Sequence, residues 1–429
     1  MKALANVDAV CNLDFAYTAD GAAGNLRFAE ADSFGFGNFT WDGGTAFGLA
    51  PDNAHVIPAA QGDTWFNHTF YNAPTIGSFG YACGILHEIG HALGLKHGHM
   101  TQDVYDANGN IVATNPTLPA ARDGLEFSVM TYRAYPGAPL SLDPPEEAPS
   151  TLMQDDIFAL QWMYGVNYGH NSGNTTYKWN SVTGEMWVNA THMGAPFAGK
   201  ILMTVWDGGG NDTYDFSNFN TPETIDLRPG GWSTPSRAKL ADLDWHANVT
   251  HLARGCIANA LTFRGDYHGY IENAFGGAGN DTVTGNELRN ELRGNAGRDA
   301  LNGGAGNDTL SGGIGIDRLT GGAGNDYFVF NTAPNAATNR DVVSDFNHVY
   351  DTFRLENAIF TKLGAGVHAL NPAFFRASTR ALDGNDYIVY DRAHGTLAYD
   401  NDGNGAHAAV AIAVLLNKPV LAANDFVVT

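Results

Sequence analysis

The sequence predicts two dissimilar halves, an α/β (α+β) domain over residues 1–170 and an all-β domain of parallel strands over residues 171–429. A chain of 429 residues is long enough for two or three domains. Before residue 170 the sequence mixes aromatic residues, short strand-like runs and two helix patterns, whereas Gly, Asn and Asp dominate beyond 171. Residues 276–330 also repeat with a period of nine, which is typical of a parallel β-helix.

The composition is strongly acidic, with 45 Asp and Glu against 23 Lys and Arg and a formal net charge of -22. This charge argues against nucleic acid and anionic membranes as partners and suits a chain that binds cations. No apolar run reaches the ~18 residues of a membrane-spanning helix, so we expect no membrane insertion. Cys11, Cys83 and Cys256 form no CxxC pair, which excludes a disulfide scaffold and a cysteine-based zinc ribbon.

The first helix pattern starts near Gly84 and contains "HEIGHALGLKHGHM", residues 87–100. Positions i and i+4 share one face of a helix, so His87 and His91 can bind one zinc ion. Glu88 lies next to the first ligand and can act as a general base on water at the metal. HExxH alone is a weak signal, because ordinary helices contain it by chance.

The pattern continues beyond the helix and becomes more specific. Gly94 can end the helix in a left-handed turn, so that His97 folds back as a third ligand and leaves a fourth position open, as a catalytic zinc requires. His99 follows too soon to bind the same metal and is expected to face solvent or to lie behind the ligands. The extended pattern followed by "SVMTY", residues 128–132, resembles the metzincin zinc endopeptidases, in which a methionine turn underlies the metal. Met130 would be that methionine; the alternative is an ordinary core residue.

The second helix pattern lies in "TLMQDDIFALQWMYG", residues 151–165. The acidic pair Asp155 and Asp156 suits a first helical turn, and Gly165 suits the end. Its apolar residues recur in helical spacing at Ile157, Leu160, Met163 and Tyr164.

The nine-residue repeat combines glycines that permit positive φ with one apolar residue per copy that points into a shared core. These apolar residues are Val283, Leu292, Leu301, Leu310, Leu319 and Phe328. An Asp at the sixth position of most copies supplies a hard oxygen that, with turn carbonyls, can bind Ca²⁺. The expected calcium residues are Gly276, Gly279, Asp281, Gly294, Gly297, Asp299, Gly303, Gly306, Asp308, Gly312, Gly315, Asp317, Gly321, Gly324 and Asp326, with Asp212 in the related segment "WDGGGNDTYDF".

A flexible linker rich in Gly, Asn and Asp is the alternative, but a linker would not keep an apolar residue in phase. In the second copy Asn290 replaces the Asp and Leu288 replaces a Gly, so we expect this turn to bind calcium poorly or not at all. A polar hairpin turn is favoured over a further calcium loop at Asp400, Asp402 and Asn404, because the glutamate of an EF-hand is missing there.

"HEIGHALGLKH", "SVMTY", "DDIFALQWMYG", "WDGGGNDTYDF" and the repeats occur in the order found in serralysins, the secreted RTX metalloproteases of Gram-negative bacteria. The resemblance runs from about residue 25 to the end and implies a metzincin-like catalytic domain followed by an RTX calcium β-roll. It implies that His87, His91 and His97 bind one Zn²⁺ and that Glu88 activates water. It also implies that Tyr132 is a further zinc ligand in the resting enzyme, and that it swings away to stabilise the oxyanion when substrate binds.

The resemblance further implies an extracellular monomer that cleaves proteins and peptides and binds several Ca²⁺ ions. Export would use a type I secretion transporter, which fits an N-terminus without the apolar core of a secretory signal. The ending "NDFVVT", with Asp425, Phe426, Val427 and Val428, resembles the acidic-plus-hydrophobic signal for that route. An ordinary edge strand would have much the same sequence.

Two other functions are possible. Only 86 residues precede His87, fewer than serralysins usually have, and loss of their first helix would remove a packing partner of the catalytic domain. The chain could then be a catalytically silent RTX module for calcium-dependent surface binding. A matrixin- or astacin-like protease with an unrelated tail is the third hypothesis, and the in-phase repeats count against it.

Overall fold

The computed structural model divides the chain into two compact units. Unit 1 comprises residues 1–172, 182–210 and 237–269, and unit 2 comprises residues 173–181, 211–236 and 270–429. The structure describes residues 2–13, 15, 27–30, 34–36, 39–41, 46–48, 63–66, 75–105, 110–141, 145–244, 246 and 249–429.

Unit 1 contains the helices of the chain that position the candidate metal site. They are α1 (Lys2–Val10), a π-helix (Gly80–Leu86) that runs directly into α2 (His87–Ala92), and α3 (Gln154–Tyr164). α3 ends at Gly165, which has a φ of 84°, and α1 lies against it. The helical segment carrying the histidines therefore begins at Gly80, earlier than the start near Gly84 that the sequence indicated, and its first turns have the wider π spacing.

Short sheets complete unit 1. α2 lies beside β4 and β5, which belong to a sheet of order β1-β5-β4. Further pairs are the hairpins β2–β3, β6–β7 and β9–β10 and the parallel pair β11–β15. The strand bounds are β1 (Arg27–Glu30), β2 (Phe34–Phe36), β3 (Phe39–Trp41), β4 (Ala46–Gly48), β5 (Asp63–Phe66), β6 (Gln102–Tyr105), β7 (Ile111–Asn115), β9 (Met186–Val188), β10 (Thr191–Gly194), β11 (Met203–Val205) and β15 (Ile257–Asn259).

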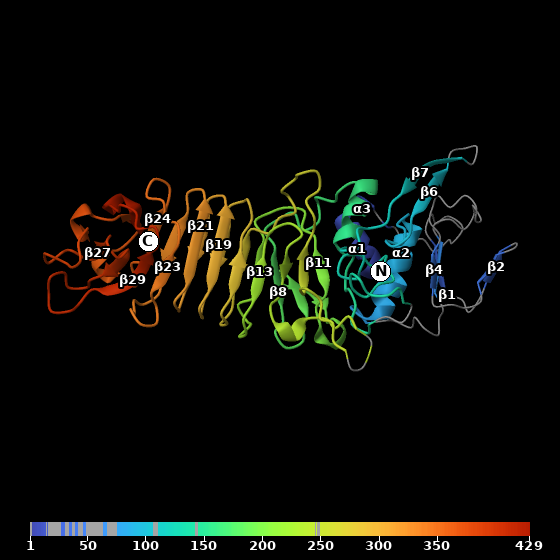
Figure 1. Ribbon diagram of the computed structural model, residues 1–429, viewed down its shortest axis with the longest axis horizontal. Coiled ribbons are helices and arrows are strands. Elements are labelled where there is room, and N and C mark those ends of the chain that lie inside the picture. Colours follow the sequence, from blue (N-terminus) through green and yellow to red (C-terminus); the bar gives the residue numbers. More distant parts are fainter. Residues whose placement is uncertain are drawn as a thin grey trace. The chain divides into compact units, whose positions relative to one another are not determined.

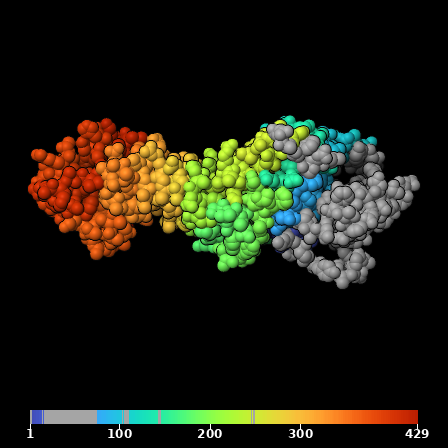
Figure 2. Space-filling model, turned by 90° about the horizontal axis from the view of Figure 1, so that it is seen from below, coloured from blue at the N-terminus to red at the C-terminus, as the bar shows by residue number. Residues whose placement is uncertain are grey.

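Unit 2 consists of two facing rows of short, mostly parallel strands, and successive strands of the repeat region alternate between them (Figure 1). Within unit 2, one row has the order β8-β12-β16-β18-β20-β22-β24-β30-β25 and the other β13-β17-β19-β21-β23-β29-β28-β27-β26. In the space-filling view, the colours of residues 270–429 pass in sequence order from yellow to red (Figure 2). The parallel β-roll expected for this part of the chain is present.

The strands of unit 2 are β8 (Thr176–Trp179), β12 (Thr213–Asp215), β13 (Thr224–Asp226), β14 (Trp232–Ser233), β16 (Asn273–Phe275), β17 (Thr282–Thr284), β18 (Glu291–Arg293), β19 (Ala300–Ala305), β20 (Thr309–Ser311), β21 (Arg318–Ala323), β22 (Tyr327–Phe330), β23 (Asp341–Val343), β24 (Thr352–Leu355), β25 (His368–Ala369), β26 (Phe375–Arg376), β27 (Ile388–Asp391), β28 (Thr396–Tyr399), β29 (Val410–Leu415) and β30 (Phe426–Val428).

The register of the rows explains the nine-residue period. Val283 pairs with Leu301, and Leu301 with Leu319, so each full turn of the roll takes two repeats. All six apolar repeat residues are at most 1% exposed, so they form the core between the two rows. Hydrophobic burial of this regular stack is what keeps the repeat in phase.

Candidate metal centre

Three histidines converge at the end of α2. His87 and His91 lie one turn apart on its face, and Gly94, with a φ of 94°, reverses the chain so that His97 returns to them. The Nε2 atom of His97 lies 3.1 Å from that of His87 and 2.9 Å from that of His91. These ligand atoms all lie within 4.8 Å of one another, so they could hold one metal ion.

Backbone carbonyls orient two of the three rings. The Nδ1 atom of His87 lies 2.7 Å from the Val129 carbonyl oxygen, and that of His91 lies 2.9 Å from the Leu95 carbonyl oxygen. An Nδ1–H that donates to a carbonyl leaves the Nε2 lone pair free for a metal. Burial lowers the pKa of His87 to about 3, with a further contribution from His91, and burial lowers the pKa of His97 to about 4. The imidazoles are therefore neutral at pH 7, as metal binding requires.

Glu88 and Tyr132 lie beside these rings. Glu88 follows the first histidine on α2 and is half-buried. The Tyr132 ring centroid lies 4.4 Å from that of His97 and 5.6 Å from that of His87. Burial raises the pKa of Tyr132, and the negative charge of Glu88 raises it further, so its hydroxyl stays protonated as a donor. His99 stacks against His97 with a centroid distance of 5.3 Å and contacts Tyr132, so it lies next to the ligand set.

Met130 packs directly beneath α2. It is 2% exposed, and its carbonyl accepts a hydrogen bond of 3.0 Å from the Gly98 amide, which follows the third histidine. A Cβ atom on Gly90 would lie only 2.4 Å from the Met130 sulfur. Gly90 therefore lets the methionine turn approach the helix that carries the histidines, a close contact that the HExxH spacing alone does not indicate.

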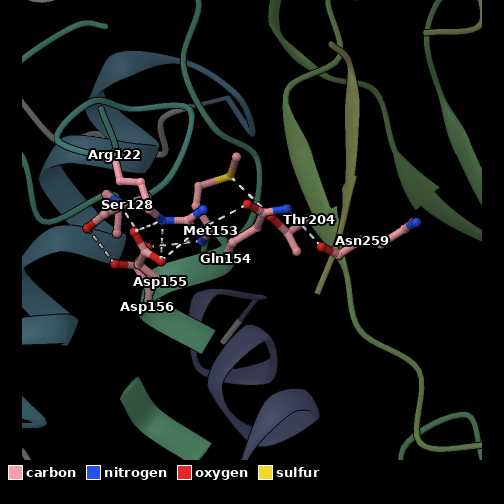
Figure 3. Close-up of polar contacts among 9 residues, drawn as sticks. Arg122, Ser128, Met153, Gln154, Asp155, Asp156, Thr204 and Asn259 are labelled. Atoms are coloured by element: carbon pink, nitrogen blue, oxygen red, sulfur yellow. Dashed lines mark hydrogen bonds and ion pairs between the residues drawn. The ribbon is translucent and has the colours of Figure 1, made fainter. Parts of the chain in front are cut away.

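A buried carboxylate at the start of α3 holds the methionine turn in place (Figure 3). Asp156 is 2% exposed and accepts hydrogen bonds from the Ser128 hydroxyl at 2.7 Å, the Val129 amide at 2.8 Å and the Met153 amide at 3.0 Å. The carbonyl of the same Val129 orients His87. Burial raises the pKa of Asp156 to about 7, although these hydrogen bonds oppose the rise. The sequence showed Asp156 only as a charge in a first helical turn, because two of its partners, Ser128 and Val129, lie far away in the chain.

The repeat aspartates form two ladders in unit 2. In each, one carboxylate oxygen accepts the amide N–H of the aspartate one turn earlier; examples are Asp281 to Asp299 and Asp308 to Asp326, at 2.8 and 2.9 Å. The second oxygen of Asp299, Asp308, Asp317 and Asp326 is buried and has no hydrogen-bond partner among the described residues. Gly297, with a φ of 135°, closes one of these turns, and a Cβ there would lie 1.8 Å from the Gly279 carbonyl oxygen.

Unpaired buried carboxylates next to backbone carbonyls are the ligands that Ca²⁺ prefers. Burial raises the pKa of both Asp299 and Asp308 to about 7, because a buried carboxylate without a positive partner is unfavourable in its ionised form. Asp212 is also fully buried, and one of its carboxylate oxygens accepts a hydrogen bond from the Thr175 amide at 2.7 Å.

The ladders extend beyond the residues that the sequence identified. The Asp317 amide donates to Asp341 at 3.1 Å, and the Asp326 amide donates to Asp351 at 3.0 Å. Burial raises the pKa of these two further aspartates to about 8 and about 6. Their sequence separations are 24 and 25 residues instead of 18, so the period of nine did not reveal them.

The C-terminal segment is part of the roll. Phe426 and Val428 belong to β30, which lies between β24 and β25, and both are buried. Asp425 is 2% exposed and accepts a hydrogen bond of 2.7 Å from the Ala422 amide. In the loop of residues 400–404, the Asp402 amide donates to the Asp400 side chain at 3.2 Å.

No helix among the described residues is long and apolar enough to cross a membrane.

Large parts of the chain are similar to known proteins. Residues 166–428 match the family model described as peptidase M10 serralysin C terminal. A metallopeptidase AprA of Pseudomonas marginalis is 33% identical over 290 residues, which cover 66% of this chain and 52% of that protein. A serralysin of Proteus mirabilis is 31% identical over 300 residues, again 66% of this chain and 52% of the relative.

The chain thus spans about half the length of the curated relatives that it matches. Among solved structures, the AlgE6R3 subunit of a mannuronan C5-epimerase from Azotobacter vinelandii is 23% identical, with a TM-score of 0.24. The match covers 34% of this chain and 77% of that subunit. A TM-score this low carries no argument about fold or function.

Proposed function

The chain belongs to the peptidase M10 serralysin family, and from this premise we propose that it is a secreted zinc endopeptidase stabilised by calcium. The observation that carries the proposal is the convergence of three neutral imidazole nitrogens from His87, His91 and His97. Three nitrogen ligands with an open position are typical of a catalytic rather than a structural zinc site. The donor set therefore fits one Zn²⁺.

Zinc in such a site supplies Lewis-acid chemistry, polarising a peptide carbonyl and lowering the pKa of water. The protein provides the proton transfers. The Glu88 carboxylate takes a proton from the attacking water and passes it to the leaving amine. The Tyr132 hydroxyl, kept protonated by its raised pKa, donates a hydrogen bond to the oxygen on which negative charge develops.

Unit 2 supports this function through calcium. The unpaired aspartates of the two ladders, with the glycine-turn carbonyls, would bind several Ca²⁺ ions and let the acidic roll fold where calcium is plentiful. The net charge of -22 opposes folding without cations and argues against nucleic acid as a partner. The proposal includes protein and peptide substrates, a monomeric enzyme outside the cell and export by a type I transporter.

Glu88→Ala tests the proposal on the full chain. We expect the variant to lose caseinolytic activity by at least about 100-fold while it retains one zinc per chain, because the residue transfers protons and does not bind the metal. Glu185→Ala, which removes a partly exposed acid of unit 1, is the control and should keep full activity. Full activity of the Glu88 variant would refute the assignment of the base. A wild-type chain that binds zinc and calcium but cleaves nothing would favour the silent RTX module instead.

A further inference from the structure

A turn far ahead of the repeats continues one of the aspartate ladders. β13 pairs with β17 in parallel, with Thr224 opposite Thr282, so residues 219–223 lie directly beside residues 277–281. The Ala278 amide donates to the Phe219 carbonyl at 3.0 Å, just as the Ala296 amide donates to the Gly277 carbonyl at 3.2 Å in the next turn of the ladder. Residues 219–223 therefore occupy the place of the preceding turn in this ladder.

The backbone of this turn follows the calcium turns position by position. The Glu223 amide donates to Asp281 at 2.9 Å, as the Asp281 amide donates to Asp299 at 2.8 Å. The carbonyl oxygen of Thr221 lies 2.3 Å from where a Cβ on Gly279 would be, and that of Gly279 lies 1.8 Å from the same point on Gly297. Thr221 thus presents its carbonyl where the array presents Gly279, and Glu223 stands at the position of the repeat aspartate.

The side chain of Glu223 points into the neighbouring turn without a partner. It is 3% exposed, and neither carboxylate oxygen forms a hydrogen bond within the described residues. One oxygen lies 2.6 Å from the position that a Cβ on Gly277 would take. Burial, followed by the charges of Asp281 and Asp299, raises the pKa of Glu223 to about 10, and the nearby Gly277 amide opposes this only in part.

Glu223, Asp281 and Asp299 therefore lie close together at the first turns of the ladder, and none of them forms an ion pair with a Lys or Arg among the described residues. A buried carboxylate without a partner costs free energy unless it is neutralised or binds a cation. Carboxylates and backbone carbonyls are hard oxygen donors, and a flexible set of six to eight of them is the environment of Ca²⁺ rather than of zinc.

We propose that residues 219–223 are a diverged calcium turn and that Glu223, with Asp281 and the carbonyl oxygens of the two turns, binds one further Ca²⁺. The site rests on the calcium binding proposed for the array and adds to it a ligand that the repeat pattern does not contain. Glutamate is one methylene longer than aspartate, which lets its carboxylate reach the next turn from a segment that lacks the repeat glycines.

Counting calcium in variants of the full chain tests this site. Metal-stripped protein is dialysed against CaCl₂, and bound calcium is measured by atomic absorption. We expect Glu223→Gln, which keeps the size of the side chain, to bind one Ca²⁺ fewer than the wild type. Glu223→Asp should reach the wild-type number only at higher calcium, because its carboxylate is withdrawn by one methylene. Glu291→Gln is the control, since Glu291 pairs with Arg293 on the outer face of β18 and should change nothing.

The outcomes separate this site from the rest of the array. Equal calcium numbers in the wild type and Glu223→Gln, with Asp326→Asn showing a loss, would overturn the Glu223 site and leave the array intact. A wild type that binds no calcium would overturn both.

Discussion

Removing the buried carboxylate of Asp156 should destabilise the metal site more than removing any surface charge of α3. In Asp156→Ala the amides of Val129 and Met153 lose their acceptor and cannot turn toward water, because both are fixed in a buried backbone. An unsatisfied buried donor costs about 1–3 kcal/mol, so the two amides together cost about 2–6 kcal/mol. The Ser128 hydroxyl can rotate and adds little.

The loss should reach the metal through His87. When the Val129 backbone shifts, its carbonyl no longer fixes the His87 ring, and such an outer contact is worth about 10–100-fold in metal affinity. Two assays measure these effects. Unfolding in urea is monitored by hydrogen exchange of residues 80–92, and zinc affinity is measured by competition with a chromophoric chelator. Asp156→Asn, which keeps one oxygen for the amides, should fall between wild type and alanine.

Asp155→Asn is the matched control. Asp155 is the adjacent acid of α3 and pairs with Arg122 at 2.6 Å in a partly exposed position, so its loss should cost about 0–1 kcal/mol. If Asp156→Ala loses no more stability and zinc affinity than Asp155→Asn, the reasoning about the methionine turn is wrong.

Three further predictions concern the two metal regions. Tyr132→Phe should lower kcat about 10–100-fold with little change in KM or zinc content, because the hydroxyl acts on the developing charge; steady-state kinetics on a peptide substrate would contradict this if only KM rose. Gly90→Ala should destabilise unit 1 by about 1–3 kcal/mol, since its Cβ would meet the Met130 sulfur, and combining it with Met130→Ala should recover part of the loss in urea unfolding. Without calcium, unit 2 should lose stability as pH rises from about 4 to 7. The pKa of Asp299 and of Asp308 is raised to about 7, so both carboxyl groups stay protonated in the folded state. In the unfolded chain the same groups ionise near pH 4, so the rise in pH favours unfolding. The slope is at most about 1.4 kcal/mol per pH unit for each group, reduced by solvent screening, and saturating calcium, which binds the ionised groups, should reverse its sign in thermal unfolding.

Local patterns in the sequence predicted the elements that local forces determine. The acidic pair and Gly165 correctly indicated both ends of α3. The apolar spacing was less reliable, because Met163 is 46% exposed although it lies in the helical series. The π-helix at Gly80–Leu86 escaped prediction, since no residue type marks the wider spacing of its hydrogen bonds.

The sequence predicted the candidate zinc ligands, which are close together in the chain, but not the residues that support them from a distance. The three histidines lie within eleven residues of one another, so spacing and one reversing glycine were enough to place them together. Asp156 reaches its partners across 27 and 28 residues, and Glu223 reaches Asp281 across 58. Contacts of that range depend on tertiary pairing, for which the sequence has no periodic signal.

The degenerate second repeat differs in its hydrogen bonding from the turns that we propose bind calcium. The side-chain oxygen of Asn290 accepts the Asn286 amide at 2.7 Å, and its NH₂ group donates to the Glu272 carbonyl and to the Asn286 side chain, each at 3.0 Å. The amide therefore satisfies its own turn, whereas Asp308 in the next turn of the same ladder keeps an unpaired buried oxygen. The NH₂ group, which stands where an aspartate has its second oxygen, donates hydrogen bonds to nearby oxygens and so takes the part that a cation would play there. By this criterion Glu223, with two unpaired oxygens, belongs with the calcium turns although its sequence does not resemble them.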